Sequence, residues 1–435
     1  MLCELGHRGS GEWQYVEEKS GFAIAANISP APSGRGEPPN RHQDSDYAAA
    51  LDGHIYNWHS LLYHETTSDT PASAAVALMR DSPSDFPAAL DGTFTLALWE
   101  KPSRNLWLVR DPLGRKPLYY SVLEPSAVLF ASEPKALLEH CGRAPSLCRE
   151  ALSAYITFAC VPAPLTLFEG VNKLFPGEIL QVNPEGIVTK HDYWHMPPFE
   201  PYADSLEDLA GPIREGLLRT LEKQILNAER VGVFLSGGVD STVILGALKL
   251  LGVRERHSFT LSHSEQGLQV DNRKDCDWAR SVATLHGATH HVIDVDARPT
   301  ALGRASKLLR LFDDPLILEN RVCGADLLSS AAAKANIDVC LSGNNQRPFG
   351  DIWEWKVLQK LLKKDSARQL ATEELVLEAN FNLFSIDEQC RLLRTSNQDV
   401  TKVAASLLDR YIRAANTTNL FDVAAASSML MRSPE

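Results

Sequence analysis

The sequence lacks the marks of several protein classes. No apolar run reaches the ~18 residues that a membrane-spanning helix needs, and the segment Met1–Trp13 is too polar for a signal-peptide core. The eight cysteines form no CxxC pair, which argues against a zinc ribbon and is typical of a reducing compartment. With a net charge of −12 and no block rich in Lys or Arg, we expect a cytoplasmic protein that binds neither a membrane nor nucleic acid.

What is present indicates two domains. A chain of 435 residues is too long for one ordinary domain, and 44% hydrophobic residues allow a sizeable core. Residues 1–195 contain short β-rich runs such as Phe94–Trp99, Leu106–Val109 and Val128–Ala131, with turns between them. A stretch rich in proline and aromatic residues, 195–204, separates this part from residues 205–435, where the pattern changes.

Strands alternate with helices in the second part. After a helix that starts with a capping box at Ser205, the pattern predicts four strands with helices between them. This alternation predicts a parallel sheet covered on both faces, and residues 352–435 are helical in pattern. The four predicted strands are Val231–Leu235, His257–Ser262, His291–Val295 and Ile337–Leu341.

The loop Ser236–Ser241 is the sharpest signal for chemistry. A buried strand leads into two glycines, and a helix follows at about Asp240, so unpaired amides and a positive dipole end face the loop. The hydroxyls of Ser236 and Ser241 can add donors to a phosphate. Asp240 would repel phosphate, yet it can hold a Mg²⁺ ion that bridges phosphates. The alternative is a plain strand–turn–helix in which the glycines serve only the turn.

Two further strand ends are expected beside this loop. In open parallel sheets a nucleotide lies across the carboxyl ends of the strands, which selects Thr260–Ser262 and Leu341–Gly343. Their backbone groups could hydrogen-bond an adenine edge. Each is equally consistent with an ordinary strand-to-loop turn.

The string SGGVDS at Ser236–Ser241 resembles the pyrophosphate loop of N-type ATP pyrophosphatases, and the whole of roughly 1–345 resembles glutamine-dependent asparagine synthetases. The resemblance implies an α+β, Ntn-hydrolase-like amidotransferase sandwich over 1–195. It further implies an α/β parallel-sheet ATP-pyrophosphatase domain over 205–435 with a helical C-terminal part. The N-terminal strings that carry it are Asp52–Asn57, Thr67–Thr70, Leu90–Trp99, Val109–Tyr120, Phe130–Ala136, Val161–Pro164 and Phe168–Gly170.

The same resemblance implies a carbon–nitrogen ligase of asparagine biosynthesis. ATP would activate a carboxylate, aspartate by family default, as an acyl-adenylate, and nitrogen from glutamine or free ammonia would then attack it. Mg²⁺ would be held by Asp240, and subunits of the family often pair as homodimers. The implied ATP-binding residues are Leu235, Ser236, Gly237, Gly238, Val239, Asp240, Ser241, Leu261, Ser342 and Gly343.

The glutamine pocket departs from the family pattern. The family's Asn-Gly-Glu reads Asp52, Gly53 and His54 here, so that Gly53 and Asp69 are the expected remnant of the glutamine site. Cys3 is expected on a helix and is not the counterpart of the family's N-terminal nucleophile. These departures predict that the chain as written does not hydrolyse glutamine.

The synthetase half departs as well. Asn344 and Arg347 replace two family carboxylates, and a guanidinium cannot bind Mg²⁺, although Asp351 lies nearby. The family's late Lys has no counterpart before Glu435, so the chain is expected to be shortened at both ends. Two alternatives therefore remain open: an intramolecular amide ligase like β-lactam synthetases, without glutaminase activity, and a degenerate nucleotide-binding protein without catalysis.

Overall fold

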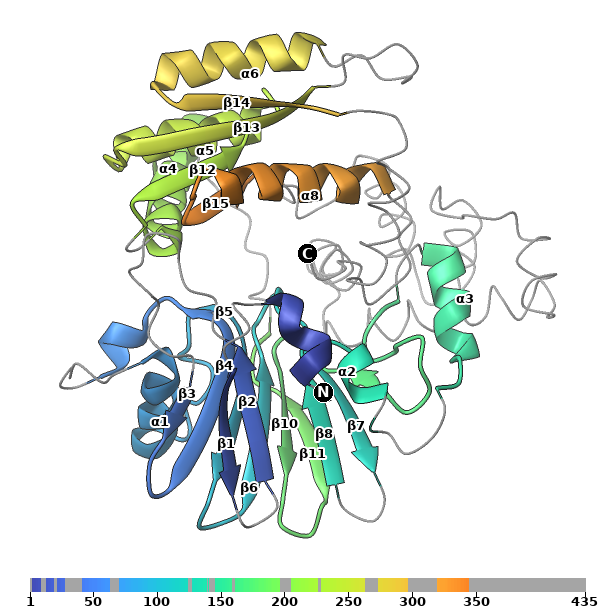
Figure 1. Ribbon diagram of the computed structural model, residues 1–435. Helices are drawn as coiled ribbons and strands as arrows, with labels where there is room; N and C mark the ends of the chain where they lie inside the picture. Colours follow the sequence, from blue (N-terminus) through green and yellow to red (C-terminus); the bar gives the residue numbers. More distant parts are fainter. Residues whose placement is uncertain are drawn as a thin grey trace. The chain divides into compact units, whose positions relative to one another are not determined.

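The computed structural model (Figure 1) has two compact units, and among the described residues the first comprises those up to 195 and the second those from 205 to 343. The helical C-terminal part expected over 352–435, like Asp69, Asn344, Arg347 and Asp351, lies outside the described residues. The structure describes residues 2–8, 13–18, 22–27, 41–62, 70–123, 127–138, 140, 145–158, 161–195, 205–225, 228–262, 273–295 and 319–343.

The first unit is built on antiparallel sheets, in agreement with the strand-rich pattern of 1–195. Its largest sheet has the order β11-β10-β6-β5-β4-β3, with β3 Arg41–Gln43, β4 Tyr47–Ile55, β5 Gly92–Glu100, β6 Asn105–Arg110, β10 Glu178–Val182 and β11 Val188–Asp192. A second sheet has the order β8-β7-β9, with β7 Tyr119–Leu123, β8 Ala127–Ala131 and β9 Asn172–Lys173. The hairpin of β1 Trp13–Glu18 and β2 Phe22–Asn27 forms a two-stranded sheet of its own.

Helices of the first unit are short. They are η1 Leu2–Arg8, η2 Trp58–Leu61, α1 Pro71–Asp81, α2 Lys135–Leu138 and α3 Arg149–Phe158. Cys3 lies in the 3₁₀ helix η1, so that the helix predicted at this position is present. The strands expected at Phe94–Trp99 and Leu106–Val109 lie within β5 and β6.

Strand alternation gives the six-stranded sheet two apolar faces. Leu96, Leu98 and Val109 point to the face that α1 covers, in one cluster with Ala72 and Val76 of that helix. The opposite face packs Ala97, Trp99 and Leu108 against Phe22 of β2 and Tyr120 of β7. The ring of Phe22 stacks on Trp99 with centroids 4.6 Å apart. The assignment of this packing to an Ntn-hydrolase-like sandwich stays a prediction.

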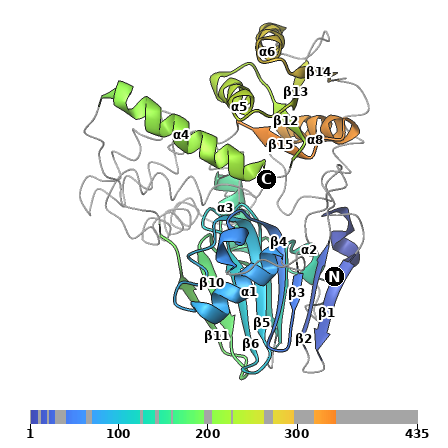
Figure 2. The same cartoon turned by 90° about the vertical axis from the view of Figure 1, so that its left-hand side faces the viewer.

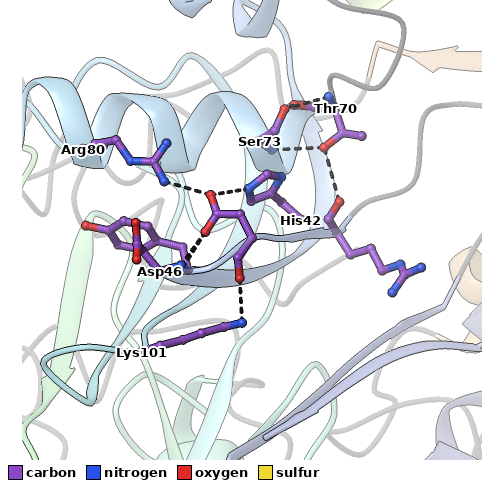
Figure 3. Close-up of polar contacts among 9 residues, drawn as sticks. His42, Asp46, Thr70, Ser73, Arg80 and Lys101 are labelled. Carbon is purple, nitrogen blue, oxygen red and sulfur yellow. Dashed lines mark hydrogen bonds and ion pairs between the residues drawn. The ribbon is translucent and has the colours of Figure 1, made fainter.

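A carboxylate fixes the turn between β3 and β4 (Figure 3). The side chain of Asp44 accepts hydrogen bonds from His42 Nε2 at 3.0 Å and from an Arg80 guanidinium N–H at 2.8 Å. It also accepts the amides of Asp46 and Tyr47 at 2.8 and 2.7 Å. Partial burial opposes ionisation of Asp44, but the hydrogen bonds outweigh it and hold its pKa well below its usual value. Because Arg80 belongs to α1, this contact ties the hairpin to the helix.

The other end of α1 is tied to the same hairpin. Thr70 caps the helix, since its hydroxyl accepts the Ser73 amide at 3.0 Å while the Ser73 hydroxyl accepts the Thr70 amide at 2.8 Å. Figure 3 shows this reciprocal pair beside β3, and the Thr70 hydroxyl also lies 3.3 Å from the Arg41 carbonyl. The helix is therefore pinned to β3 and β4 at both of its ends.

The second unit contains the predicted parallel sheet. All neighbours in the order β14-β13-β12-β15 are parallel, with β12 Arg230–Phe234, β13 Glu255–Ser262, β14 Thr289–Asp294 and β15 Val339–Ser342. Each observed strand lies within two residues of its predicted bounds. The helices are α4 Leu206–Gln224, α5 Val239–Leu250, α6 Arg273–His286 and α8 Glu319–Lys334. The capping box predicted at Ser205 is present at the start of α4.

Helices cover both faces of this sheet, as predicted. Val231 and Val233 of β12, and Leu235 just after it, pack with residues of α5 and α6 in one buried cluster. Phe234 and Phe259 point the other way and pack with Ala332 near the end of α8. Figure 2 shows α5 and α8 on opposite sides of the strands. Among the described residues, no helix is both long and apolar enough to span a membrane.

The histidines of β13 and β14 predict that the second unit weakens in acid. Burial lowers the pKa of His290 from 6.5, and the charges of Arg280 and His291 lower it further. The unfolded chain therefore takes up this proton at a higher pH than the folded chain, so that stability is full above pH 6.5 and falls as the pH drops below it. We expect hydrogen exchange of β13 and β14 peptides, corrected for intrinsic rates, to be faster at acidic pH. H290Q should reduce this difference, and H191Q on exposed β11 should not; an equal effect of both variants would contradict the assignment.

Candidate nucleotide site

The loop after β12 is a tight turn that only glycine fits. Gly237 has a φ of +82°, in the left-handed region that side chains rarely adopt. A Cβ placed there would lie 2.7 Å from the carbonyl oxygen of Asp275 and 3.2 Å from the amide of Ala279, both in α6. Gly238 caps α5 with a φ of −72° and brings no side-chain cap. The first glycine is therefore required by the backbone and by α6, whereas the second is not strained.

Hydroxyl groups close the loop on itself. The Ser236 amide lies 3.3 Å from the Ser241 hydroxyl, and the Gly238 amide lies 3.3 Å from the Ser236 hydroxyl. The buried Ser241 hydroxyl donates to the Gly238 carbonyl at 3.2 Å, so it points into the loop rather than outward as a phosphate donor. Two loop amides thus have long hydrogen bonds within the protein, and the loop keeps its shape through its own serines.

The first turn of α5 adds main-chain amides to the loop, of which that of Ser241 lies against Gly343. Val239, Asp240 and Ser241 supply its first three amides, which have no carbonyl partner within the helix. The side chain of Val239 is 77% exposed, and Asp240 is exposed beside it. This end of the helix carries the positive dipole. The arrangement can bind phosphate oxygens through the main chain, while the Asp240 carboxylate can hold a cation next to them.

The end of β15 lies against this loop. Phe234 of β12 pairs with Ser342, the last residue of β15. A Cβ on the next residue, Gly343, would fall 2.9 Å from the Ser241 amide nitrogen and 3.1 Å from Asp240 Cβ. Gly343 therefore touches the start of α5 with bare backbone, and Ser342 and Gly343 are brought to the loop as the sequence predicted for parallel strand ends.

The two leucines expected beside adenine lie differently. Leu235 is 1% exposed and packs its side chain into the α5–α6 core, so only its backbone can border a ligand. Leu261 is partly exposed near the end of β13, and its Cδ1 would lie 2.8 Å from a Cβ on Gly324 of α8. Leu261 thus presents a side chain between the sheet and α8, where the flat face of a base could pack.

The residues at the loop could hold Mg²⁺ only together with phosphate oxygens of a nucleotide. Mg²⁺ keeps several waters and is usually bound by one or two carboxylates together with substrate phosphates. Asp240 is exposed at the loop, where it can serve as one such carboxylate. In the described part of the chain, no group of three or more His, Cys, Asp or Glu side chains could hold a metal alone.

Beside Gly53 of the glutamine-site remnant, Asp52 carries a charge whose partners the sequence did not predict. Gly53 has a φ of +115°, and a Cβ there would meet the Thr93 carbonyl of β5 at 2.1 Å. Beside it, Asp52 pairs with Lys116 at 3.0 Å and with Arg8 at 3.5 Å, and it accepts the Ser132 hydroxyl at 2.8 Å. Burial opposes ionisation of Asp52, but Lys116 and Arg8 outweigh it and lower its pKa.

A second carboxylate shares Arg8 with Asp52. Glu133, whose side chain is 1% exposed, contacts Arg8, His7 and Lys135. Burial raises its pKa, but the hydrogen bonds from Lys135 and Arg8 prevail and lower it. These partners went unnoticed in the sequence because they come from three distant strings. The sequence shows these charges but not that they meet, because His7 and Arg8 lie in η1 while Lys135 lies in α2, with Glu133 just before it.

Lys116 reaches Asp52 because a buried aspartate shapes its loop. The carboxylate of Asp111, which is fully buried, accepts the amides of Leu113, Arg115 and Lys116 at 3.0 to 3.2 Å. Burial raises the pKa of Asp111 despite these bonds. The loop after β6 is thus wrapped around one side chain, which directs Lys116 toward β4.

Comparison with known proteins finds a matching family model for residues in each unit. Residues 1–194 match the family model described as glutamine amidotransferase domain, and residues 212–345 match the one described as asparagine synthase. Each model covers less than half of the chain, and both agree with the resemblance to glutamine-dependent asparagine synthetases. The recognition made from the loop and the N-terminal strings is therefore confirmed.

Curated relatives are 27% to 29% identical to the chain over their aligned residues. Asparagine synthetase [glutamine-hydrolyzing] 1 of Bacillus subtilis (strain 168) is 27% identical over 78% of this chain and 52% of its own length. A putative asparagine synthetase [glutamine-hydrolyzing] of Mycobacterium tuberculosis (strain ATCC 25618 / H37Rv) is 29% identical over 72% of this chain and 50% of its own. The chain thus spans about half the length of these curated relatives.

A solved structure gives a weaker match. The glutamine phosphoribosylpyrophosphate amidotransferase from B. subtilis, complexed with ADP and GMP, is 15% identical, with a TM-score of 0.32 over 67% of this chain and 77% of that chain. A TM-score this low says nothing further about the fold.

The two glycines of the loop give a matched test. G237A should destabilise the second unit by about 1–3 kcal/mol, because it strains a left-handed backbone and meets the Asp275 carbonyl. It should also abolish any rise in Tm on addition of ATP and Mg²⁺. G238A, where the nearest atom is the Ser236 hydroxyl at 3.3 Å, should keep most of that rise. Equal behaviour of the two variants in differential scanning fluorimetry would disprove the assigned backbone role.

Asp52 gives a test in the first unit. D52N should lower the free energy of unfolding by about 1 kcal/mol at neutral pH, because Lys116 and Arg8 lose their shared partner and the site is partly open to water. Since the pKa of Asp52 is lowered in the fold, its contribution is present above the unfolded value of 3.8 and disappears as the pH falls through the folded pKa. Urea unfolding from pH 7 to pH 3 should show this gap closing, with D85N as an exposed control.

Proposed function

We propose that this chain is an ATP-dependent amide-forming enzyme that activates a carboxylate as an acyl-adenylate. One observation carries the proposal: the turn at Gly237 delivers β12 directly into the first, unpartnered amides of α5, with Gly343 of the neighbouring strand against them. This arrangement lies inside the residues that match the asparagine synthase family. Similar relatives bear the name asparagine synthetase, so aspartate is the first carboxylate to test.

The charges of the site suit a triphosphate with its cation. The phosphate oxygens would lie on the amides of Val239–Ser241, where the helix dipole favours negative charge. Asp240 would repel bare phosphate, which makes it the ligand for Mg²⁺, and the ion would neutralise the departing pyrophosphate. Leu261 and Ser342, on the two strands beside β12, would border the base.

The chemistry then needs two displacements. A carboxylate oxygen of the substrate attacks the α-phosphorus, and the bond to pyrophosphate breaks. A nitrogen nucleophile next attacks the acyl carbon, and AMP leaves with the pair of electrons of the broken acyl–oxygen bond. In this proposal the protein contributes binding and orientation through the loop, because the main chain fixes the phosphates in place before the reaction.

The nitrogen source is proposed to be free ammonia rather than glutamine bound in the first unit. Asp52 stands where the family has a neutral Asn, and its charge is taken up by Lys116, Arg8 and Ser132. An ionised carboxylate in that place has no proton to donate to the oxyanion that forms during amide hydrolysis, whereas the N–H of an Asn amide has. The same observation favours a second candidate, an intramolecular ligase like β-lactam synthetases, which needs no ammonia.

The test is isotope exchange between ATP and pyrophosphate in the presence of aspartate and other carboxylates. We expect exchange to require a carboxylate and Mg²⁺, and ammonium, but not glutamine, to support amide formation. Amide formed without any ammonium would favour the intramolecular ligase. ATP binding without exchange for any carboxylate would leave only a nucleotide-binding protein and refute the proposed activity.

Asp240 is the residue to change. D240N should raise the Mg²⁺ concentration needed for half-maximal exchange and slow exchange about 10-fold or more, because an amide is a poor Mg²⁺ ligand. D277N is the matched control, since Asp277 is exposed on α6 and pairs only at the surface with Arg280 at 3.0 Å. An unchanged Mg²⁺ dependence in D240N would remove the metal role of this carboxylate.

A further inference from the structure

The carbonyl that begins the nucleotide loop is held by a buried side chain of the neighbouring strand. Thr260 of β13 is 4% exposed, and its hydroxyl donates to the Leu235 carbonyl at 2.5 Å. The strand-end argument includes Thr260 only for its backbone groups, and neither it nor the family motif gives its side chain a role. The contact joins the interior of β13 to the last residue before Ser236.

Its position is decided by where the ladder stops. The register of β12 with β13 ends at the pair Phe234 and Phe259, while β13 continues to Ser262 alongside β14. One more backbone bond follows, from the Leu235 amide to the Phe259 carbonyl at 2.9 Å. Leu235 is therefore the residue at which the chain leaves the sheet, and Thr260 takes its carbonyl there.

Two bonds from one strand therefore fix both peptide planes of Leu235. The amide bond to Phe259 orients the plane before its Cα, and the Thr260 hydroxyl orients the plane after it. The second plane contains the Ser236 amide, which in turn meets the Ser241 hydroxyl at 3.3 Å. Rotation of that plane would move the whole Ser236–Ser241 loop relative to the amides of α5.

We infer that Thr260 is a positioning residue for the nucleotide loop: its hydroxyl, by holding the Leu235 carbonyl, sets the direction in which the backbone enters the phosphate-binding turn. The inference rests on the proposed nucleotide function of that turn. Thr260 itself touches no substrate. Its effect passes through the peptide between Leu235 and Ser236, so removal of the hydroxyl loosens the loop without opening the core.

The strand offers a matched control two residues earlier. Ser258 is fully buried on the same strand, and its hydroxyl bonds to His290 Nδ1 at 2.9 Å, on β14 and away from the loop. S258A therefore removes a buried hydroxyl from β13 without touching Leu235. T260V removes the hydroxyl and keeps the volume of the side chain, whereas T260S keeps the hydroxyl.

Two readouts separate the inference from the nucleotide function. By hydrogen exchange in the absence of ATP, T260V should speed exchange in the peptide covering Ser236–Ser241 about 10-fold, which is the scale of one lost buried hydrogen bond. By calorimetric titration with ATP and Mg²⁺, T260V should raise Kd by about 10-fold. T260S and S258A should stay close to the wild type in both experiments.

Each outcome of these experiments either supports or overturns the positioning role of Thr260. Faster hydrogen exchange of the loop in T260V, together with wild-type exchange in T260S, supports the positioning role whether or not the wild type binds ATP. Absence of ATP binding by the wild type would refute the proposed function and not the positioning role. Unchanged loop exchange and unchanged Kd in T260V, or equal effects in S258A, would overturn the inference, because they would reduce Thr260 to an ordinary core residue. If T260V does not fold, T260A is measured in the same way.

Discussion

The candidate nucleotide site depends on where the chain leaves the parallel sheet: β12 ends at Phe234, whereas the neighbouring strand β13 continues to Ser262. At Leu235 the ladder ends, the chain turns through a left-handed glycine, and a helix starts within four residues. Such an exit requires contacts from both sides. The backbone of α6 lies against Gly237, and Gly343 of β15 lies against the first turn of α5. The loop is therefore enclosed by its neighbours rather than supported by a core of its own.

The two units use buried charge in different ways. In the first unit, Asp44, Asp52 and Glu133 each have basic partners, and their pKa values are lowered. In the second unit, burial and cationic neighbours lower the pKa values of His257 and His290 in the sheet. The first unit gains from ionised groups near neutral pH, and the second gains from neutral ones.

Much of the second unit was predictable from sequence because its signals are local. An apolar run of five residues, two glycines and a helix start define the loop, and parallel strand ends then place Ser342 and Gly343 beside it. The bounds of β13 and β14 were missed by two residues because the flanking Glu255 and Thr289 are polar and break the apolar run. Long-range pairs were out of reach. No local pattern says that Lys116 meets Asp52, or that Thr260 meets Leu235, since those contacts depend on strand order and loop shape.

Asp240, Val239 and Ser236 project side chains from a turn whose binding groups belong to the main chain. Gly237 and Gly343 expose peptide groups by having nothing to cover them. Recognition built from peptide groups does not depend on which side chains surround it, as long as the backbone path is kept. Substitution of the exposed side chains at this turn therefore leaves the peptide groups of the proposed anion site in place.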